Sequence, residues 1–381
     1  MTMPNTSIQQ ALLLFFLDAL PWARFSRLLD ELDSPAHIIQ ADSSVLRTLG
    51  LKDVQIAAIH GCAADSALQR QAEQAITWCE AEANRHILLK SDPLYPPLLR
   101  EIHDPPPLIF VLGQAQALLL PQIAMIGSRR CSVDGMANAA QFSQYLAGQH
   151  LSICSGMAQG IDTCAHEGAL AVDGVTVAVL GTGADVVYPR SNRALAAKII
   201  ERGALVSELP LGSKAIASHF PRRNRIISGM SAGVIVIEAA MKSGSLITAR
   251  LAIEHNRELF AVPGSIRNPL SVGAHRLIQQ GAQLIDSPEQ IVEQLDSVLG
   301  GQISLLHEAG RKVCDQNAEE VLAPNLGAEA QELIKAIGYD PMPLEIIVER
   351  SGLPLSRVQT HLLRLELDGH IHNYRGRYSL S

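Results

Sequence analysis

Short apolar runs alternate with amphipathic stretches between about residue 120 and residue 300, and this alternation constrains the fold more than any other feature of the chain. The apolar runs are typical of buried strands and cover residues 123–126, 151–154, 175–180, 205–206, 234–237, 259–262 and, more weakly, 284–285. The amphipathic stretches have helical periodicity and cover residues 134–148, 162–172, 192–202, 245–256, 273–280 and 288–295. Repeated strand–helix units predict an α/β fold with a mostly parallel sheet.

Glycine-rich and serine-rich turns follow five of these predicted strands. They contain Gly127, Ser155, Gly181, Lys242 and Gly264. Because the carboxyl ends of parallel strands lie at one edge of a sheet, we expect all five turns at that edge. A tight strand-to-helix connection would explain any one turn, but five converging turns present backbone N–H groups and helix N-termini that attract an anion. The sequence therefore predicts an anion-binding edge.

Three arginines, Arg222, Arg223 and Arg225, form a cluster in a chain whose net charge is -7. Charged clusters usually form a solvated surface, but this one is flanked by Pro221 and small residues instead of carboxylates. Guanidinium groups beside glycine-rich turns suit phosphate groups. We therefore expect these arginines near the same edge, together with Arg129, Arg130 and Lys242.

The composition restricts the class of protein and of ligand. A length of 381 residues predicts two or three domains, and the negative net charge means that any phosphate binding must be local. Six scattered cysteines without a C-x-x-C pair argue against zinc and disulfides and indicate the reducing cytoplasm. The apolar run 11–17 is too short to span a membrane and lacks the basic start of a signal peptide. Aromatic residues make up 4%, so we expect a ligand held mainly by its phosphates, with one base beside Phe220.

The motifs argue against an enzyme, a metal site and a cofactor. The sequence has no P-loop motif, and Gly181-Thr182-Gly183 lacks the third glycine of a dinucleotide fingerprint. Asp162 and His166 lie four residues apart on a predicted helix, but no third metal ligand accompanies them, and Asp162 suits a helix cap better. We expect no catalytic residue, no metal and no cofactor.

Four segments are expected along the chain. Residues 1–80 have helical periodicity and a helix–glycine–helix pattern around Gly50, which predicts a helical domain of the SAM or helix-hairpin-helix kind. Such a hairpin can grip a DNA backbone, but without a basic cluster it is better explained as a docking or oligomerisation module. Residues 81–300 form the α/β domain, residues 301–326 a linker, and residues 327–381 three helices and a hairpin, the pattern of a winged helix.

The predicted winged helix, residues 327–381, has six basic and seven acidic residues. A phosphate backbone attracts clustered positive charge, which this segment lacks. We therefore expect it to contact protein or the rest of the chain, with only Arg375 and Arg377 in the wing able to touch nucleic acid. A transcription regulator that reads duplex DNA with its winged helix is a less favoured alternative.

Seven motifs in the α/β region resemble the DNA-processing protein A family, and the match runs from about residue 92 to residue 282. They cover residues 126–129, 155–162 with His166, 181–189 with Asn192, 207–208, 220–227, 238–239 with 243–246 and Thr248, and 262–264. The resemblance implies an extended Rossmann-like domain that dimerises. It also implies a cytoplasmic single-stranded DNA-binding protein of natural transformation, which shields incoming strands and helps to load the RecA recombinase. Ser128, Met157 and His275 depart from the residues that the family often has at these positions.

Carried over by position, the resemblance implies that DNA contacts the side chains of Ser128, Arg129, Lys242 and the arginine cluster. It also implies contacts with the backbone amides around Gly156, Gly160 and Gly244, while Asn224 holds the shape of its loop. The expected site residues are Gly127, Ser128, Arg129, Ser155, Gly156, Gly160, Arg222, Arg223, Asn224, Arg225, Lys242, Ser243, Gly244 and Ser245. The alternative is an enzyme. Rossmann-like phosphoribohydrolases of the lysine-decarboxylase-like group act on nucleoside monophosphates with similar turns, although their P-G-G-x-G-T turn is absent from this sequence.

Overall fold

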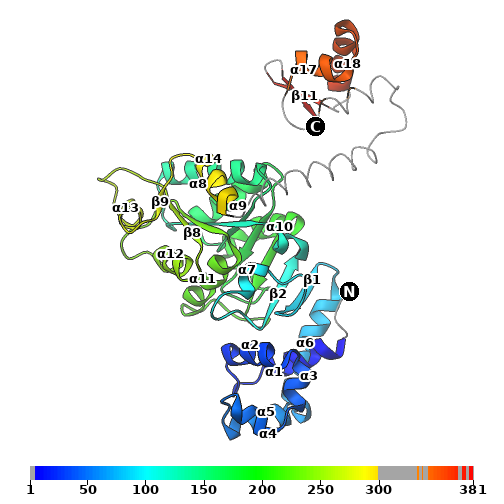
Figure 1. Cartoon of the computed structure of the whole chain (residues 1–381), viewed down its shortest axis with the longest axis vertical. Coiled ribbons are helices and arrows are strands. Elements are labelled where there is room, and N and C mark those ends of the chain that lie inside the picture. The colour runs from blue at the N-terminus through cyan, green and yellow to red at the C-terminus, as the bar shows by residue number, and fades with distance from the viewer. Residues whose placement is uncertain are drawn as a thin grey trace. The chain divides into compact units, whose positions relative to one another are not determined.

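The computed structural model describes residues 5–298, 333, 337, 342–367, 371–374 and 377–380. Its contacts divide the chain into two compact units, Met1–Ile303 and Ser304–Ser381, and each unit is described by itself (Figure 1). The predicted linker, 301–326, lies outside the described residues. The predicted domain boundary between residues 80 and 81 stays a prediction, because the N-terminal helices belong to the same compact unit as the sheet.

Helices fill the N-terminal part of the first unit. They are α1 (Asn5–Phe15), α2 (Trp22–Leu32), α3 (Pro35–Gln40), α4 (Ser43–Thr48), α5 (Asp53–Gly61) and α6 (Ser66–Ala81), with the 3-10 turn η1 (Cys62–Ala64). Two of them begin at a side chain that accepts backbone N–H groups, Ser34 before α3 and Asp65 before α6. Their inward faces share one hydrophobic cluster with Leu108 and Phe110 of the sheet. The N-terminal helices are therefore packed directly onto the sheet.

A nine-stranded sheet forms the centre of the first unit, in the order β1-β2-β6-β5-β4-β3-β7-β8-β9. The strands are β1 (Arg85–Leu89), β2 (Leu108–Gly113), β3 (Gln122–Ile126), β4 (Ser152–Ser155), β5 (Thr176–Val179), β6 (Ala204–Ser207), β7 (Gly233–Val236), β8 (Glu258–Ala261) and β9 (Gln283–Leu284). Strands β1 and β2 form an antiparallel hairpin, and β2 pairs antiparallel with β6. All pairs from β6 to β9 are parallel. The predicted α/β class with a mostly parallel sheet is confirmed.

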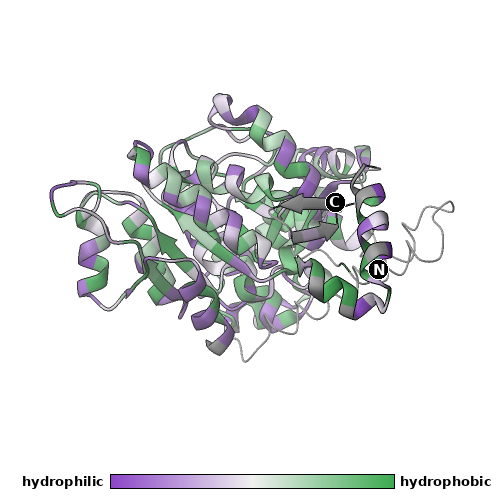
Figure 2. Cartoon of the chain, turned by 90° about the horizontal axis from the view of Figure 1, so that it is seen from above, coloured by the Kyte–Doolittle hydropathy of each residue, from purple (hydrophilic) through white to green (hydrophobic). Residues whose placement is uncertain are grey.

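Helices cover both faces of this sheet. They are α7 (Pro97–Arg100), α8 (Val133–Gly148), α9 (Ile161–Ala171), α10 (Arg193–Arg202), α11 (His219–Met230), α12 (Ser245–Glu254), α13 (Val272–Gln279) and α14 (Glu289–Val298), with the 3-10 turns η2 (Ala115–Leu119) and η3 (Arg190–Asn192). Alternate residues of β3 serve opposite faces: Ala124 and Ile126 pack with α11, α12 and α13, whereas Ile123 and Met125 pack with α8, α9 and α14. In Figure 2 the central strands are mostly green and the helices alternate between purple and green, as expected for a sheet that is buried on both faces.

Helix α11 corrects one expectation. A loop is expected around the arginine cluster, whereas the structure places the cluster in a helix that runs from His219 to Met230. Pro221 is compatible with the first helical turn, where backbone N–H groups have no intrahelical acceptor. Ile226, Ile227 and Met230 then recur at helical spacing and are buried against the sheet. Burial of this apolar face therefore explains the helix.

The second unit has a winged-helix fold, as predicted. It contains β10 (Met342–Pro343), α17 (Leu344–Ser351), α18 (Leu355–Leu367), β11 (Ile371–Tyr374) and β12 (Arg377–Leu380), and its sheet has the order β10-β12-β11. Leu333 and Ile337 are helical and join a buried cluster with Val358 and Leu362 of α18. Arg375 and the side chain of Arg377 lie outside the described part of the chain. Among the described residues of both units, no helix has the length and apolarity that crossing a bilayer requires.

Candidate nucleic-acid interface

The first unit has a topological switch point between β3 and β7. The chain proceeds from β3 outward through β4, β5 and β6, and then returns to the other side of β3 to form β7. Diverging connections of this kind open a crevice at the carboxyl ends of the two central strands. A cavity of about 820 Å³ lies there, lined by the turns after β3 and β7 and by the first turns of α11 and α12.

This cavity, named here the edge cavity, brings together nine of the fourteen expected site residues. They are Gly127, Ser128, Arg129, Arg223, Asn224, Lys242, Ser243, Gly244 and Ser245. The turns after β4 and β5 lie at the same edge because these strands are parallel to β3. The convergence predicted from the sequence is therefore present in the structure, while the role of these residues in binding stays a prediction.

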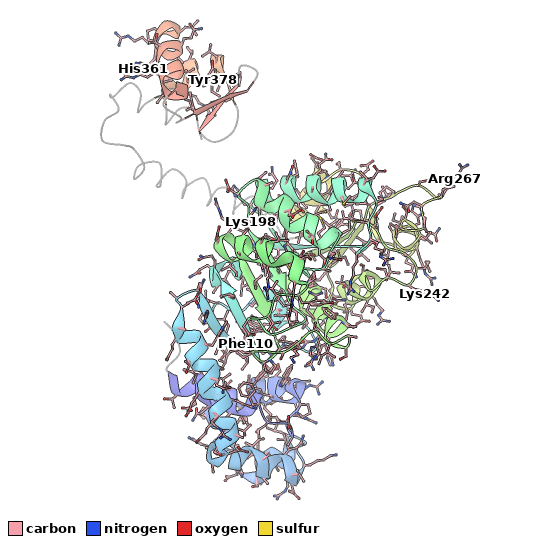
Figure 3. All side chains as sticks on the ribbon, turned by 180° about the vertical axis from the view of Figure 1, so that it is seen from behind. Phe110, Lys198, Lys242, Arg267, His361 and Tyr378 are labelled. Carbon is pink, nitrogen blue, oxygen red and sulfur yellow. The ribbon has the colours of Figure 1, made fainter. Side chains whose placement is uncertain are left out.

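Three cations beside the edge cavity are exposed. They are Arg129 and Arg130, which follow β3, and Lys242, which follows β7 and projects from the surface in Figure 3. Within the described part of the chain, none of the three forms an ion pair. The Ser128 hydroxyl accepts the Arg130 N–H at 3.1 Å and shapes the turn that carries both arginines. Among the described residues, positive charge without a carboxylate partner is thus concentrated beside the cavity.

The amino end of α12 closes the floor of the edge cavity. The Ser245 hydroxyl donates to the Gly127 carbonyl at 2.8 Å, which ties the start of α12 to the turn after β3. The Ser243 hydroxyl accepts the Ser245 N–H at 3.2 Å. Gly244, Ser245, Ile247 and Thr248 line the cavity, so the positive end of the helix dipole faces it. The N–H groups of Ser245, Leu246 and Ile247 are bonded within this turn, so the first turn of α12 attracts a phosphate group mainly through the helix dipole.

Two aromatic rings form a wall of the edge cavity. Phe220 and Tyr188 both line it, with ring centroids 5.7 Å apart at an interplanar angle of 46°. The Arg129 guanidinium lies 5.8 Å from the centre of the Phe220 ring. Gly181 packs against this ring so closely that a Cβ would lie 2.8 Å from it. Tyr188, which is half exposed, is not among the expected site residues, and its position in the motif 181–189 is the one signal that could have identified it.

Arg223 supports the edge cavity from beneath. It is 5% exposed and donates to the Gly156 carbonyl at 2.6 Å and to the Val179 carbonyl. Gly156 has no room for a side chain, because a Cβ would lie 2.6 Å from the guanidinium. The buried Ser155 hydroxyl donates to the Met125 carbonyl at 2.6 Å. Ser155 and Arg223 therefore both have a structural role next to the edge cavity, and their predicted contacts with DNA stay predictions.

Gly160 also supports the cavity from behind. Its φ of 81° lies in the left-handed region, and a Cβ would meet the Ser128 carbonyl oxygen at 2.4 Å and the Arg129 carbonyl oxygen at 2.8 Å. This close approach fixes the turn after β4 against the turn that carries Arg129. Gly160 and Gly156 thus act on the cavity through their neighbours and do not line it.

Asp162 and His166 are separate structural groups. The Asp162 carboxylate accepts the Ala158 N–H at 3.2 Å; burial raises the pKa of Asp162, and the Arg223 guanidinium opposes that rise. His166 is fully buried with its Nδ1 2.6 Å from the Thr176 hydroxyl, and burial lowers the pKa of His166 to about 3. Among the described residues, no group of three or more His, Cys, Asp or Glu side chains is arranged to hold a metal ion.

Arg222 and Arg225 lie outside the lining of the edge cavity. They are three residues apart on α11, so they share a helix face and converge on Glu208, which is buried at the end of β6. Arg225 also lies 3.6 Å from the Asp104 carboxylate. Burial raises the pKa of Glu208, and Arg225 and Arg222 oppose that rise. Arg225 is buried, whereas the Arg222 side chain is 43% exposed. Their predicted contacts with DNA stay predictions.

Two family models match the chain. The model described as DNA recombination-mediator protein A matches residues 86–296, which contain the whole edge cavity, and the model described as DprA winged helix domain matches residues 317–377. The chain belongs to the DNA recombination-mediator protein A family.

Relatives of this family are similar to the chain over most of their length. Protein Smf of Escherichia coli strain K12 is 42% identical over 311 residues, which cover 81% of each chain. DNA processing protein DprA of Streptococcus pneumoniae strain R6 is 46% identical over 205 residues, covering 54% of this chain and 72% of that one.

Two solved structures share the fold. The X-ray structure of DNA processing protein A from Streptococcus pneumoniae has a TM-score of 0.59 at 36% identity, and the match covers 77% of this chain and 98% of that one. A structure of DNA processing protein A from Helicobacter pylori, reported for its unique single-stranded DNA binding mode, has a TM-score of 0.51 at 28% identity. That match covers 57% of this chain and 96% of the other.

Proposed function

We propose that the chain binds single-stranded DNA in the edge cavity. The observation that carries this proposal is the combination, at one switch point, of three exposed cations, the amino end of α12 and an aromatic wall. Phosphate groups would lie between Arg129, Arg130 and Lys242 and accept hydrogen bonds from the backbone at Gly244. The relative from Helicobacter pylori, whose structure was reported for single-stranded DNA binding, supports the same ligand class.

The aromatic wall explains why the bound strand should be single. A base can pack against Phe220 and Tyr188 only when it is unstacked and unpaired, as in single strands. In a duplex both faces of each base are covered, and entry would require unstacking. Phosphate contacts carry no sequence information, so the identity of the base should matter little.

The cavity chemistry favours a binding protein over a nucleoside monophosphate phosphoribohydrolase. Hydrolysis of a glycosidic bond needs a general acid or base within hydrogen-bonding reach of substrate or water. Among the described residues that line the edge cavity, Asp162 is the one carboxylate, and it accepts the Ala158 N–H. This arrangement supports a protein without catalytic activity.

The test measures binding and hydrolysis in parallel. Fluorescence anisotropy with labelled oligothymidine should show binding by the wild type, weaker binding by Arg129→Ala and Lys242→Ala, and a tighter complex with single strands than with a duplex of equal length. Arg202→Ala is the matched control, because Arg202 is exposed on α10, pairs with Asp173 at 2.6 Å and lies outside the edge cavity. Release of adenine from adenosine monophosphate, or equal loss of affinity in all three variants, would contradict the proposal.

The cellular role follows from the family. The chain would shield single strands during natural transformation and help to load the RecA recombinase in the cytoplasm. The described cysteines, Cys62, Cys79, Cys131, Cys154 and Cys164, are all free, as suits a reducing compartment. Strand exchange by RecA on strands covered with a single-strand binding protein should accelerate when the wild type is added and not when Arg129→Ala is added.

A homodimer would be formed through exposed apolar side chains of α12, α13, β9 and the turn before α12. Ile253, Leu284, Met241 and Val272 are between 38% and 55% exposed, and a hollow of about 260 Å³ lies between α12 and α13. Exposed apolar patches of this kind mark protein interfaces. Light scattering should find a dimer for the wild type and a monomer for Ile253→Glu; a dimer in both would place the interface elsewhere.

A further inference from the structure

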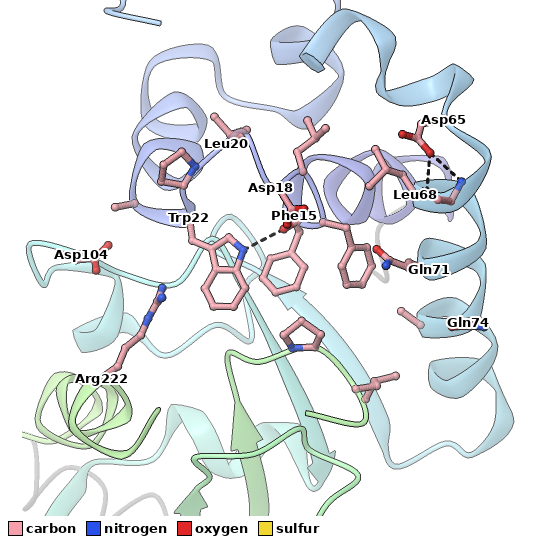
Figure 4. A pocket seen from close by; sticks show the side chains of 18 residues that line it. Phe15, Asp18, Leu20, Trp22, Asp65, Leu68, Gln71, Gln74, Asp104 and Arg222 are labelled. Atoms are coloured by element: carbon pink, nitrogen blue, oxygen red, sulfur yellow. Dashed lines mark hydrogen bonds between the residues drawn. The ribbon is translucent and has the colours of Figure 1, made fainter. Parts of the chain in front are cut away.

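The first turn of α11 separates two cavities. On one side, Phe220 and Arg223 border the edge cavity. On the other side, Arg222 borders a second cavity of about 930 Å³ between the N-terminal helices and the sheet (Figure 4). The loop after β6 has the same arrangement, with Leu211 at the second cavity and Ala217 at the edge cavity. A displacement of this turn would therefore change both cavities.

Trp22 of the N-terminal helices holds Arg222 in place. The guanidinium lies 4.5 Å from the centre of the Trp22 ring, within the range of a cation–π contact. Trp22 also stacks on Phe15, with centroids 4.7 Å apart at 10°, and its Nε1 donates to the Phe15 carbonyl at 3.0 Å. Figure 4 shows Arg222 on the side of Trp22 that faces away from Phe15. Phe15 in turn packs edge-on against Phe110 of β2, which anchors Trp22 to the sheet.

Glu208 holds the same arginine from the sheet. Its carboxylate is 3.2 Å from the Arg222 Nε and also pairs with Arg225 one turn further along α11. Glu208 is 2% exposed, so its two arginine partners hold a buried charge. Trp22, Arg222 and Glu208 together are named here the Arg222 clamp.

The first turn of α11 needs such external support. Two arginines, Arg222 and Arg223, lie near the positive end of the helix dipole, where cations are unfavourable. Within the described residues, no side chain caps this helix and no acidic residue occurs in its first turn. The local sequence thus opposes the turn that carries Phe220 into the edge cavity, and contacts from outside the helix must stabilise it.

We infer that the N-terminal helices set the affinity of the edge cavity for single strands, and that Trp22 is a positioning residue acting through Arg222 on the first turn of α11. This inference rests on the proposed function. Trp22 does not line the edge cavity, so it touches no bound strand there. Removing its ring leaves Arg222 held by Glu208 alone. Phe220, two residues before Arg222 in the first turn, then loses part of its fixed placement, while Arg223 stays bonded to the Gly156 and Val179 carbonyls.

A double-mutant cycle tests the inference. Trp22→Ala and Arg222→Ala should each weaken oligothymidine binding about threefold to tenfold, the range that one cation–π contact supports, and the double variant should bind no more weakly than either single variant. The salt dependence of binding should stay that of the wild type in all three variants, because no phosphate contact is removed. Trp22→Phe, which keeps an aromatic face, should restore most of the affinity.

Ile38→Ala is the control for general destabilisation. Ile38 is fully buried among the same N-terminal helices but belongs to α3, outside the clamp. The Ile38→Ala substitution should lower the melting temperature of the protein and leave its affinity for oligothymidine unchanged. Circular dichroism at the assay temperature checks that every variant is folded.

Fluorescence gives a second readout. The chain has two tryptophans, so Trp78→Phe leaves Trp22 as the sole reporter. Adding oligothymidine should change the fluorescence emission of Trp22, with the midpoint at the same oligothymidine concentration as in the anisotropy titration. Arg222→Ala should abolish that change. Wild-type affinity in Trp22→Ala, strictly additive losses in the cycle, or equal weakening in Ile38→Ala would overturn the inference. Failure of the wild type to bind single strands would instead overturn the proposed function.

Discussion

The salt dependence of binding distinguishes the side chains that face the ligand from those that hold the fold. Each phosphate neutralised in a single strand contributes about -0.7 to the slope of log K against log salt. The structure leaves three exposed cations at the edge cavity, Arg129, Arg130 and Lys242, which gives a slope of about -2. Including the three arginines of α11 would give about -4, but Arg223 is bonded to carbonyl oxygens, and Arg222 and Arg225 are paired with Glu208.

Anisotropy titrations with labelled oligothymidine between about 50 and 200 mM salt measure this slope. Lys242→Ala should reduce it by about 0.7 and lower affinity for all sequences alike. Arg222→Ala should lower the affinity through the loss of the Arg222 clamp but keep the wild-type slope. Comparison with Lys242→Ala therefore separates a positioning role from a phosphate contact. This assignment of the arginines would be refuted by a wild-type slope near -4 that becomes less steep in Arg222→Ala. An affinity that does not depend on salt would refute the phosphate site itself.

Three further predictions concern the support of the site and the two units. Removing residues 327–381 should leave single-strand affinity within about tenfold, or about 1.4 kcal/mol; complete loss of binding in a folded truncation would move the site to the winged helix. Gly160→Ala should cost about 1 to 3 kcal/mol of stability in chemical unfolding, because φ is positive and the added Cβ meets Ser128, whereas Gly148→Ala, with open space around it, should be nearly neutral. Burial holds the pKa of His166 at about 3. Below about pH 6.5 the unfolded chain therefore binds a proton at this imidazole that the folded chain does not bind. The unfolding free energy should fall by up to about 1.4 kcal/mol for each pH unit between about pH 6.5 and pH 3. His166→Asn should flatten that decline between about pH 6.5 and 5 in urea titrations; an unchanged pH dependence would mean that other groups cause it.

The sheet and most of its helices could be predicted from the sequence because parallel strands that are buried on both faces appear as continuous apolar runs. Each predicted run between residues 123 and 285 corresponds to a strand from β3 to β9, with ends that differ by a few residues. The edge cavity could be anticipated for a related reason, since the direction of a parallel sheet places the turns after β3 and β7 together whatever their separation in the chain.

The assignment of individual arginines could not be obtained in this way. It depends on α11 being a helix, which Pro221 and the charged residues obscure. Once the helix is known, a spacing of three residues puts Arg222 and Arg225 on one face and Arg223 on another. Their partner Glu208 comes from a different strand, and Trp22 from the N-terminal helices, so both contacts are tertiary. The same holds for the packing of Phe15 on Phe110.

Photochemical cross-linking locates the bound strand most directly. An oligothymidine that carries 5-iododeoxyuridine, bound to the full chain and irradiated, reacts with aromatic rings that it touches, and mass spectrometry identifies the modified peptides. We expect cross-links at Phe220 and Tyr188, lost in Arg129→Ala at the same oligonucleotide concentration and retained in Arg202→Ala. Cross-links confined to residues 5–81 or to residues 342–380, with none at the edge cavity, would contradict the account.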